Sequence, residues 1–360
     1  MTGDPLCPQE PQCPRRRGAA ASSRRHRRTE HHPSAAPHPG NTNGTVYGDF
    51  VATHVDAMVI GPGHGSPIFL PWHRQYLIEF EQALNRTETA RGKPRIALAY
   101  WDWTTDREEN ASPWTDAWLG ENSSGLLGQV QRSRFGVPDA ELAKVLSEPT
   151  LSLLRAAGGI KKVTWEEQEA VWREVVQNLA ERPDSLAGRW VIDRTVDSRA
   201  FLIRDFDRPL SETLPFGRRE TDAEKQARRK YEGEFYRDYG IGLMDMLDLP
   251  VYDVFAQRFE DDQHGAVHAE LGGALGGMAS PNDPAFWFLH SFVDKVWADW
   301  QAKQRREHPD AAPYLPVQGT GDILGYRDLF GPWKTMTAEK LINTAEIRHP
   351  QYGLISYTYG

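Results

Sequence analysis

The sequence predicts a mainly α-helical protein whose core is a four-helix bundle, with few short strands. Apolar residues recur at helical spacing in four separate segments, and each of these segments carries at least one histidine. Residues that favour helix starts and stops flank the same segments. With 360 residues, 39% of them hydrophobic and 11% aromatic, the chain can bury a large core.

The first two helices are expected near the front of the chain. Tyr47, Phe50, Val51 and His54 recur at helical spacing, and a loop rich in Gly and Pro follows at residues 61–63. A second helix is predicted to begin at Pro71, a residue favoured in the first turn, and it includes His73. Its apolar face consists of Trp72, Tyr76, Leu77, Phe80 and Leu84.

The other two helices are expected near the back. His264 and His268 are four residues apart, which places both imidazoles on one helix face with their Cβ atoms about 5–6 Å apart. The pair Gly272-Gly273 is predicted to end that helix. Residues 282–284 then supply an N-cap and a first-turn proline, and the helix that follows carries His290 on its inward, apolar stripe.

The region between these pairs of helices is less informative. Residues 96–103 form an apolar run that we interpret as a buried strand or a short extended segment. Residues 105–250 mix acidic helices with loops, and one helix is well marked there by a capping box of Thr164 and Glu167. The apolar face of that helix is formed by Val171, Val175, Val176 and Leu179.

Residues 1–44 are predicted to be a disordered leader, and residues 45–360 a single domain. The leader is rich in Arg, Pro, Ala, Ser and His and shows neither helical nor strand periodicity. Because it resembles no folded element, we take a wrong start site or an out-of-frame reading as a hypothesis. N-terminal sequencing of the native protein would contradict that hypothesis by returning Met1.

Composition excludes several classes of function. The net charge of −8 gives no reason to expect nucleic acid as a partner, and no apolar stretch is long enough to span a membrane. The leader lacks the apolar region of a secretory signal, so we expect a cytoplasmic protein, with export alongside a partner protein as the alternative. Both cysteines, Cys7 and Cys13, lie in the leader, where they cannot crosslink the domain.

Six histidines form two groups of three, and these groups predict a metal centre. Imidazole is the commonest protein metal ligand, and a structural zinc site would normally include cysteine. Zinc hydrolases usually carry a glutamate directly after the first histidine of a pair four apart, whereas Gly265 occupies that position. Six neutral imidazoles instead favour two copper ions. The two groups are His54, His64 and His73, and His264, His268 and His290.

Three motifs resemble the tyrosinase family of type-3 copper proteins, in particular its bacterial members. They are residues 64–74 (HGSPIFLPWHR), residues 100–103 (YWDW) and residues 280–297 (SPNDPAFWFLHSFVDKVW), and the resemblance covers about residues 46–360. It implies that the front triplet holds one copper ion and the back triplet a second. It also implies O2-dependent oxidation of ortho-diphenols or ortho-aminophenols to quinones or quinone imines.

The resemblance leaves other activities open. Members that hydroxylate monophenols often carry asparagine after the first ligand of the second copper, where it acts together with an upstream glutamate. Here Gly265 has no side chain, and Glu260 resembles the glutamate, so we expect weak monophenol hydroxylation. Alternatives are a monophenol-hydroxylating tyrosinase, a haemocyanin-like O2 carrier, and, for Glu260, a plain solvated charge. A helper protein that delivers copper is a possible partner.

Two aspartates are candidates for supporting the metal ligands. Asp102 lies between two tryptophans, and Asp294 follows His290 by one helical turn. Either carboxylate could fix a ligand imidazole, although we expect Asp294 to form an ion pair with Arg74 instead. Small residues at 276–279 are expected to form the open rim through which an aromatic substrate reaches the site.

Overall fold

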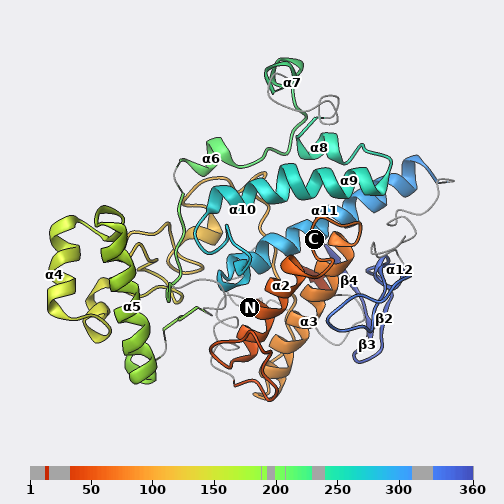
Figure 1. The fold of residues 1–360 in the computed structure, drawn as a ribbon. Coiled ribbons are helices and arrows are strands. Elements are labelled where there is room, and N and C mark those ends of the chain that lie inside the picture. Colours follow the sequence, from red (N-terminus) through yellow and green to blue (C-terminus); the bar gives the residue numbers. More distant parts are fainter. Residues whose placement is uncertain are drawn as a thin grey trace, which may run out of the picture.

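The computed structural model describes residues 13–15, 33–187, 189–192, 199–206, 208–228, 240–309 and 327–359. It is mainly helical, and four helical segments enclose the centre of the molecule, as predicted (Figure 1). These segments are α2 (Val46–Val59), α3 (Phe69–Thr89), the continuous stretch from α9 (Tyr252–Arg258) to α10 (Ala266–Leu271), and α11 (Ala285–Glu307). The stretch from α9 to α10 includes a π-helical turn, η6 (Phe259–Gly265).

Local sequence explains where these helices begin and end. Thr45 caps α2, because its side chain accepts a hydrogen bond from the Gly48 N–H at 3.0 Å. Helix α3 begins at Phe69, two residues before the predicted start at Pro71. Helix α10 ends at Leu271 as predicted, because Gly272 follows with a φ of +54°, which a residue with a side chain adopts only under strain.

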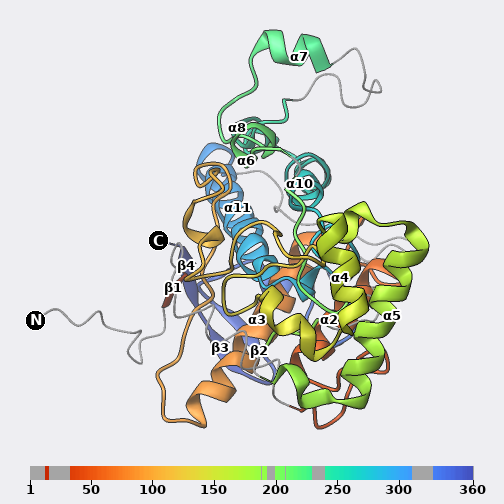
Figure 2. The same cartoon turned by 90° about the vertical axis from the view of Figure 1, so that its left-hand side faces the viewer.

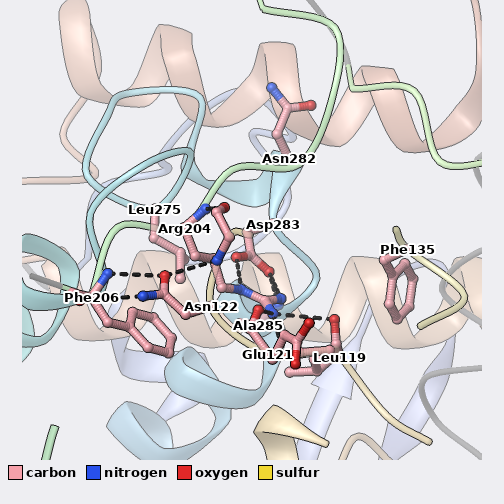
Figure 3. A network of polar contacts seen from close by, with 12 residues as sticks. Leu119, Glu121, Asn122, Phe135, Arg204, Phe206, Leu275, Asn282, Asp283 and Ala285 are labelled. Atoms are coloured by element: carbon pink, nitrogen blue, oxygen red, sulfur yellow. Dashed lines mark hydrogen bonds and ion pairs between the residues drawn. The ribbon is translucent and has the colours of Figure 1, made fainter. Parts of the chain in front are cut away.

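The start of α11 is fixed by a buried polar network (Figure 3). The Asp283 carboxylate accepts a hydrogen bond from the Ala285 N–H at 2.8 Å and receives two more from the Arg204 guanidinium at 2.7 and 2.8 Å. Arg204 also donates to the carbonyls of Leu119 and Gly120. Both charged side chains are fully buried, so the network ties the start of α11 to two other parts of the chain.

An equally buried ion pair joins α11 to α3. The Arg74 Nε donates to Asp294 Oδ1, and its guanidinium lies 3.8 Å from the centre of the Trp297 ring. The Asp294 carboxylate also accepts hydrogen bonds from the hydroxyls of Tyr357 and Tyr359 in the last strand. The predicted pairing of Asp294 with Arg74 is therefore confirmed, and the pair also holds the C-terminal segment against the bundle.

Strands are few and short, as expected. β1 (Cys13–Arg15) pairs in parallel with β4 (Tyr357–Tyr359), and β2 (Ile347–His349) pairs antiparallel with β3 (Gly353–Ile355). Residues 96–103 are extended rather than part of a named strand, and the Trp101 N–H donates to the Phe288 carbonyl of α11 at 3.0 Å. This segment therefore lies against α11 as a buried extended run.

Part of the leader contacts the domain. In addition to β1, the structure describes residues 33–44 of the leader. In this segment the His38 N–H and the Asn41 side-chain amide each donate to the Asp49 carboxylate of α2 at 2.7 Å. Described contacts therefore begin upstream of the predicted boundary at residue 45, because a backbone N–H and a side-chain amide of the leader both donate to the Asp49 carboxylate in the first turn of α2. The other leader residues lie outside the described residues, and their disorder and the start-site hypothesis stay predictions.

A second, smaller hydrophobic core lies beside the bundle. It contains α4 (Glu148–Ala157) and α5 (Trp165–Glu181), which stand apart from the long helices in Figure 1 and face the viewer in Figure 2. Helix α5 carries the predicted capping box, with Thr164 accepting from the Glu167 N–H. Leu151, Leu154, Val171 and Val175 fill this core. Residues 105–250 thus supply a lobe as well as loops.

The remaining elements are short. The α-helices are α6 (Leu210–Thr213), α7 (Asp222–Arg228), α8 (Leu243–Met246) and α12 (Ala338–Leu341). The 3-10 helices are η1 (Ser112–Trp114), η2 (Asp139–Lys144), η3 (Ile160–Lys162), η4 (Pro183–Leu186) and η7 (Ser280–Asn282). Among the described residues, no helix is both long and apolar enough to cross a membrane.

Removing Asp294 is expected to destabilise the fold strongly. The change Asp294→Ala leaves the Arg74 charge buried without its carboxylate, which typically costs about 3–5 kcal/mol. Urea unfolding of the metal-free protein measures the loss. Asp299→Ala is the control on the same helix, because it removes only a solvent-exposed pair with Lys295 and should cost at most about 1 kcal/mol. Equal losses in the two variants would contradict the assignment.

Candidate metal centre

The six predicted histidines converge at the centre of the bundle. His54 lies on α2, His64 on the loop after it and His73 on α3, while His264 lies in η6, His268 on α10 and His290 on α11. Within each triplet, ring nitrogens from all three residues lie within 4.8 Å of one another. The two triplets face each other, since the rings of His73 and His290 stack with centroids 4.3 Å apart.

Five of the six rings are oriented by a hydrogen bond at Nδ1. His54 donates to the Met278 carbonyl at 2.7 Å, and His268 donates to the Leu275 carbonyl at 2.8 Å. His73 and His264 each use the carbonyl four residues earlier, at 3.0 and 3.2 Å. His64 alone uses a side chain, the Glu260 carboxylate, at 3.1 Å. This pattern places the proton on Nδ1 and directs the Nε2 lone pair inward.

The inward nitrogens need a cation. The Nε2 atoms of His54 and His64 lie 3.2 Å apart. Because both rings carry their proton on Nδ1, neither Nε2 atom can donate, and no hydrogen bond joins the two Nε2 atoms. His73 Nε2 is buried with no hydrogen-bond partner. In the other triplet, His264 Nε2 and His268 Nε2 each lie 3.3 Å from His290 Nε2. Bare lone pairs that converge in this way fit a metal ion in each triplet.

Burial keeps five of the ligands neutral. It lowers the pKa of His268 to about 4, and it is also the largest cause that lowers the pKa of four other ligands well below the ordinary value. Neighbouring histidines lower the pKa of those four further, because two imidazolium charges would repel. These four are His54, His73, His264 and His290. Neutral imidazole is the form that binds metal.

Two phenylalanines contact both triplets. The Phe69 ring lies 4.8 Å from His73 and 4.9 Å from His264, centroid to centroid. The Phe286 ring lies 4.9 Å from His54 and 4.0 Å from His290. Apolar rings in these positions keep water away from the ligand nitrogens, while the side chain of His64 remains 17% exposed and Met278 remains 40% exposed.

The structure places Glu260 and Gly265 together in η6. The Glu260 carboxylate lies against His64, where it also accepts a hydrogen bond from the Gly65 N–H at 2.9 Å. Gly265 directly follows His264, and a Cβ built there would lie 3.1 Å from the Glu260 carbonyl oxygen. The other candidate, Asp102, accepts hydrogen bonds from the backbone and side chain of Thr104.

Sequence reasoning missed the groups that orient the ligands. Two of them are carbonyls one helical turn before His73 and His264, which the helical pattern could have indicated. The Met278 and Leu275 carbonyls lie in the loop before α11, where no periodicity fixes the backbone. The contact between Glu260 and His64 joins residues 196 positions apart, and the π-helical turn that sets it has no recognised sequence signal.

Comparisons with known proteins agree with this geometry. Residues 44–303 match the common central domain of tyrosinase. A tyrosinase from Streptomyces glaucescens is 32% identical over 314 residues, which cover 83% of this chain and 86% of that protein. Grixazone synthase from Streptomyces griseus subsp. griseus is 32% identical over 294 residues, covering 78% and 79% of the two chains.

A solved structure shares the fold. A polyphenol oxidase variant from Thermothelomyces thermophila superposes with a TM-score of 0.58 at 20% sequence identity, covering 99% of this chain and 91% of that chain. When two copper ions occupy such a pair of histidine triplets, they supply O2 binding and electron transfer. The first ion would be held by the front triplet and the second by the back triplet. This chain belongs to the tyrosinase family and carries its dinuclear copper centre.

Proposed function

We propose that the protein uses O2 to oxidise ortho-diphenols or ortho-aminophenols to ortho-quinones or quinone imines. The observation that carries the proposal is the pair of facing triplets, in which neutral imidazoles direct bare Nε2 atoms inward. Each phenol gives up two electrons and two protons. One O2 accepts four electrons and four protons, so two phenols are oxidised for every two waters formed.

The rim supports access of an aromatic ring. Gly276 and Gly277 are exposed and carry no side chain to cover the site, and Met278 beside them is partly exposed. The His64 side chain is 17% exposed, whereas His73 and His290 are buried. An accessible centre favours an oxidase over a carrier, because a carrier must keep reductants away from its bound oxygen.

Two residues favour diphenols over monophenols. Hydroxylation of a monophenol requires removal of the phenol proton by a correctly placed base or base-bound water. Gly265 offers no side chain for that purpose, and the Glu260 Oε1 already accepts hydrogen bonds from His64 and Gly65. We therefore infer weak monophenol hydroxylation, with a tyrosinase of full monophenol activity as the second candidate. The helper protein that delivers copper and the cytoplasmic location stay predictions.

Each triplet is expected to bind its own copper ion. Replacing His73 or His290 with alanine should lower the copper content from two ions to one per chain, because either change leaves one triplet intact. Atomic absorption after dialysis against copper measures this content. His308→Ala, at the far end of α11, is the control and should keep both ions. Loss of both ions from each single-ligand variant would contradict two separate sites.

Substrate preference is expected to separate the candidate functions. O2 uptake by the copper-loaded protein should be fast with catechol and 2-aminophenol. It should be at least about 100-fold slower in kcat/KM with tyrosine, because the group that would take the phenol proton is missing. A Clark electrode measures all three rates. Fast uptake with tyrosine would favour the monophenol-hydroxylating candidate, and no uptake with any of them would favour an O2 carrier.

A further inference from the structure

One residue contacts ligands of both triplets through two different groups. The Glu260 carboxylate accepts hydrogen bonds from the His64 Nδ1–H at 3.1 Å and from the Gly65 N–H at 2.9 Å. The Glu260 main-chain carbonyl accepts a hydrogen bond from the His264 Nδ1–H at 3.2 Å. We propose that Glu260 is a positioning residue that fixes one ligand of each copper site, a role that rests on the dicopper site of the proposed function.

The side-chain contact matters because His64 is the one ligand of the six that lies outside a helix. A helix fixes the direction of the Cα–Cβ bond of the other five. His64 lies instead in a loop, followed by Gly65 with a left-handed φ of +59°. Both hydrogen bonds from this loop converge on Oε1 of Glu260. A single carboxylate oxygen therefore holds both the His64 ring and the backbone N–H of the residue that follows it.

The Glu260 carboxylate also differs in kind from the acceptors of the other rings. His54, His73, His264 and His268 donate to neutral backbone carbonyls. Hydrogen bonds to a carboxylate are roughly twice as strong as neutral ones, and they make the imidazole a better electron donor. The Glu260 side chain is only 11% exposed, which limits competition from water. The first copper site is therefore the one that the Glu260 side chain stabilises.

The main-chain contact lies close to Gly265. The backbone of Gly265 is helical, with a φ of −61°, so a glycine is not required there by its conformation. What glycine provides is space, because a Cβ would approach the Glu260 carbonyl oxygen to 3.1 Å. That oxygen is the acceptor for His264. A side chain at residue 265 would therefore push on the group that orients the first ligand of the second copper site.

The carboxylate contact is tested in a protein that keeps only the first site intact. In a His290→Ala background, Glu260→Ala should weaken Cu(I) binding by about 10- to 100-fold, the usual effect of losing the partner of a ligand histidine. Glu260→Gln should bind with an affinity between those of the parent and of Glu260→Ala, since an amide oxygen can accept the same two hydrogen bonds but carries no charge. Gln257→Ala is the control, because Gln257 lines the same cavity of about 190 Å³ beside Glu260.

Competition with a chromophoric Cu(I) chelator measures these affinities without any phenol or turnover. Melting of the metal-free variants, followed by far-UV circular dichroism, shows whether each one folds. Unchanged affinity in Glu260→Ala would overturn the proposal, and so would Glu260→Gln binding as weakly as Glu260→Ala. Failure of O2 uptake with every phenol, with these affinity changes present, would defeat the proposed function and leave the positioning role standing.

The main-chain contact is tested separately in a His73→Ala background, which keeps only the second site. Gly265→Ala should weaken Cu(I) binding about fivefold, the size of effect expected when one hydrogen bond is lost. Gly277→Ala is the matched control, because a Cβ there would meet no atom within 4 Å. Equal affinity in Gly265→Ala and its parent, or an equal loss in Gly277→Ala, would overturn this half of the proposal.

Discussion

Six imidazole nitrogens point at one another inside an apolar interior, and the arrangement of the surrounding helices follows from the need to hold them there. Lone pairs at 3.2–3.3 Å repel unless a cation lies between them. Burial prevents the rings from relieving this repulsion by taking up protons, because desolvation disfavours the charged form. The centre therefore favours binding of a metal ion over protonation, and hydrogen bonds at Nδ1 fix five of the six rings in the neutral, metal-binding orientation.

Helix α11 carries His290, and two buried ion pairs fix the position of this helix. It is held on one side of His290 by Asp283 and Arg204, and on the other side by Asp294 and Arg74. All four charged side chains are at most 1% exposed. Buried ion pairs of this kind add little net stability compared with apolar residues, but they are intolerant of any change in geometry. The two pairs therefore give α11 a defined axial and rotational position, which is what a ligand such as His290 requires.

The sequence was sufficient for the ligands and for most of the bundle, because helical periodicity and the spacing of histidines depend on local geometry. The start of α3 was misplaced by two residues, since proline is tolerated anywhere in the first turn. The contacts of Glu260 were not predictable, because they depend on a π-helical turn and on a loop far away in the sequence. The lobe formed by α4 and α5 was also missed, since one capped helix does not reveal its packing partner.

The lobe formed by α4 and α5 and the helix bundle around the copper ligands have separate hydrophobic cores. The apolar contacts of the lobe are collected in a core of their own, separate from the aromatic core around the copper ligands. Local opening in proteins follows such cooperative units, so backbone amides in α4 and α5 can exchange with solvent while the bundle stays closed. Loosening of α4 and α5 can accordingly leave the aromatic core around the copper ligands intact, and the Ile203 carbonyl, which accepts a hydrogen bond from the Ala274 N–H, joins the second core to the loop that orients His268.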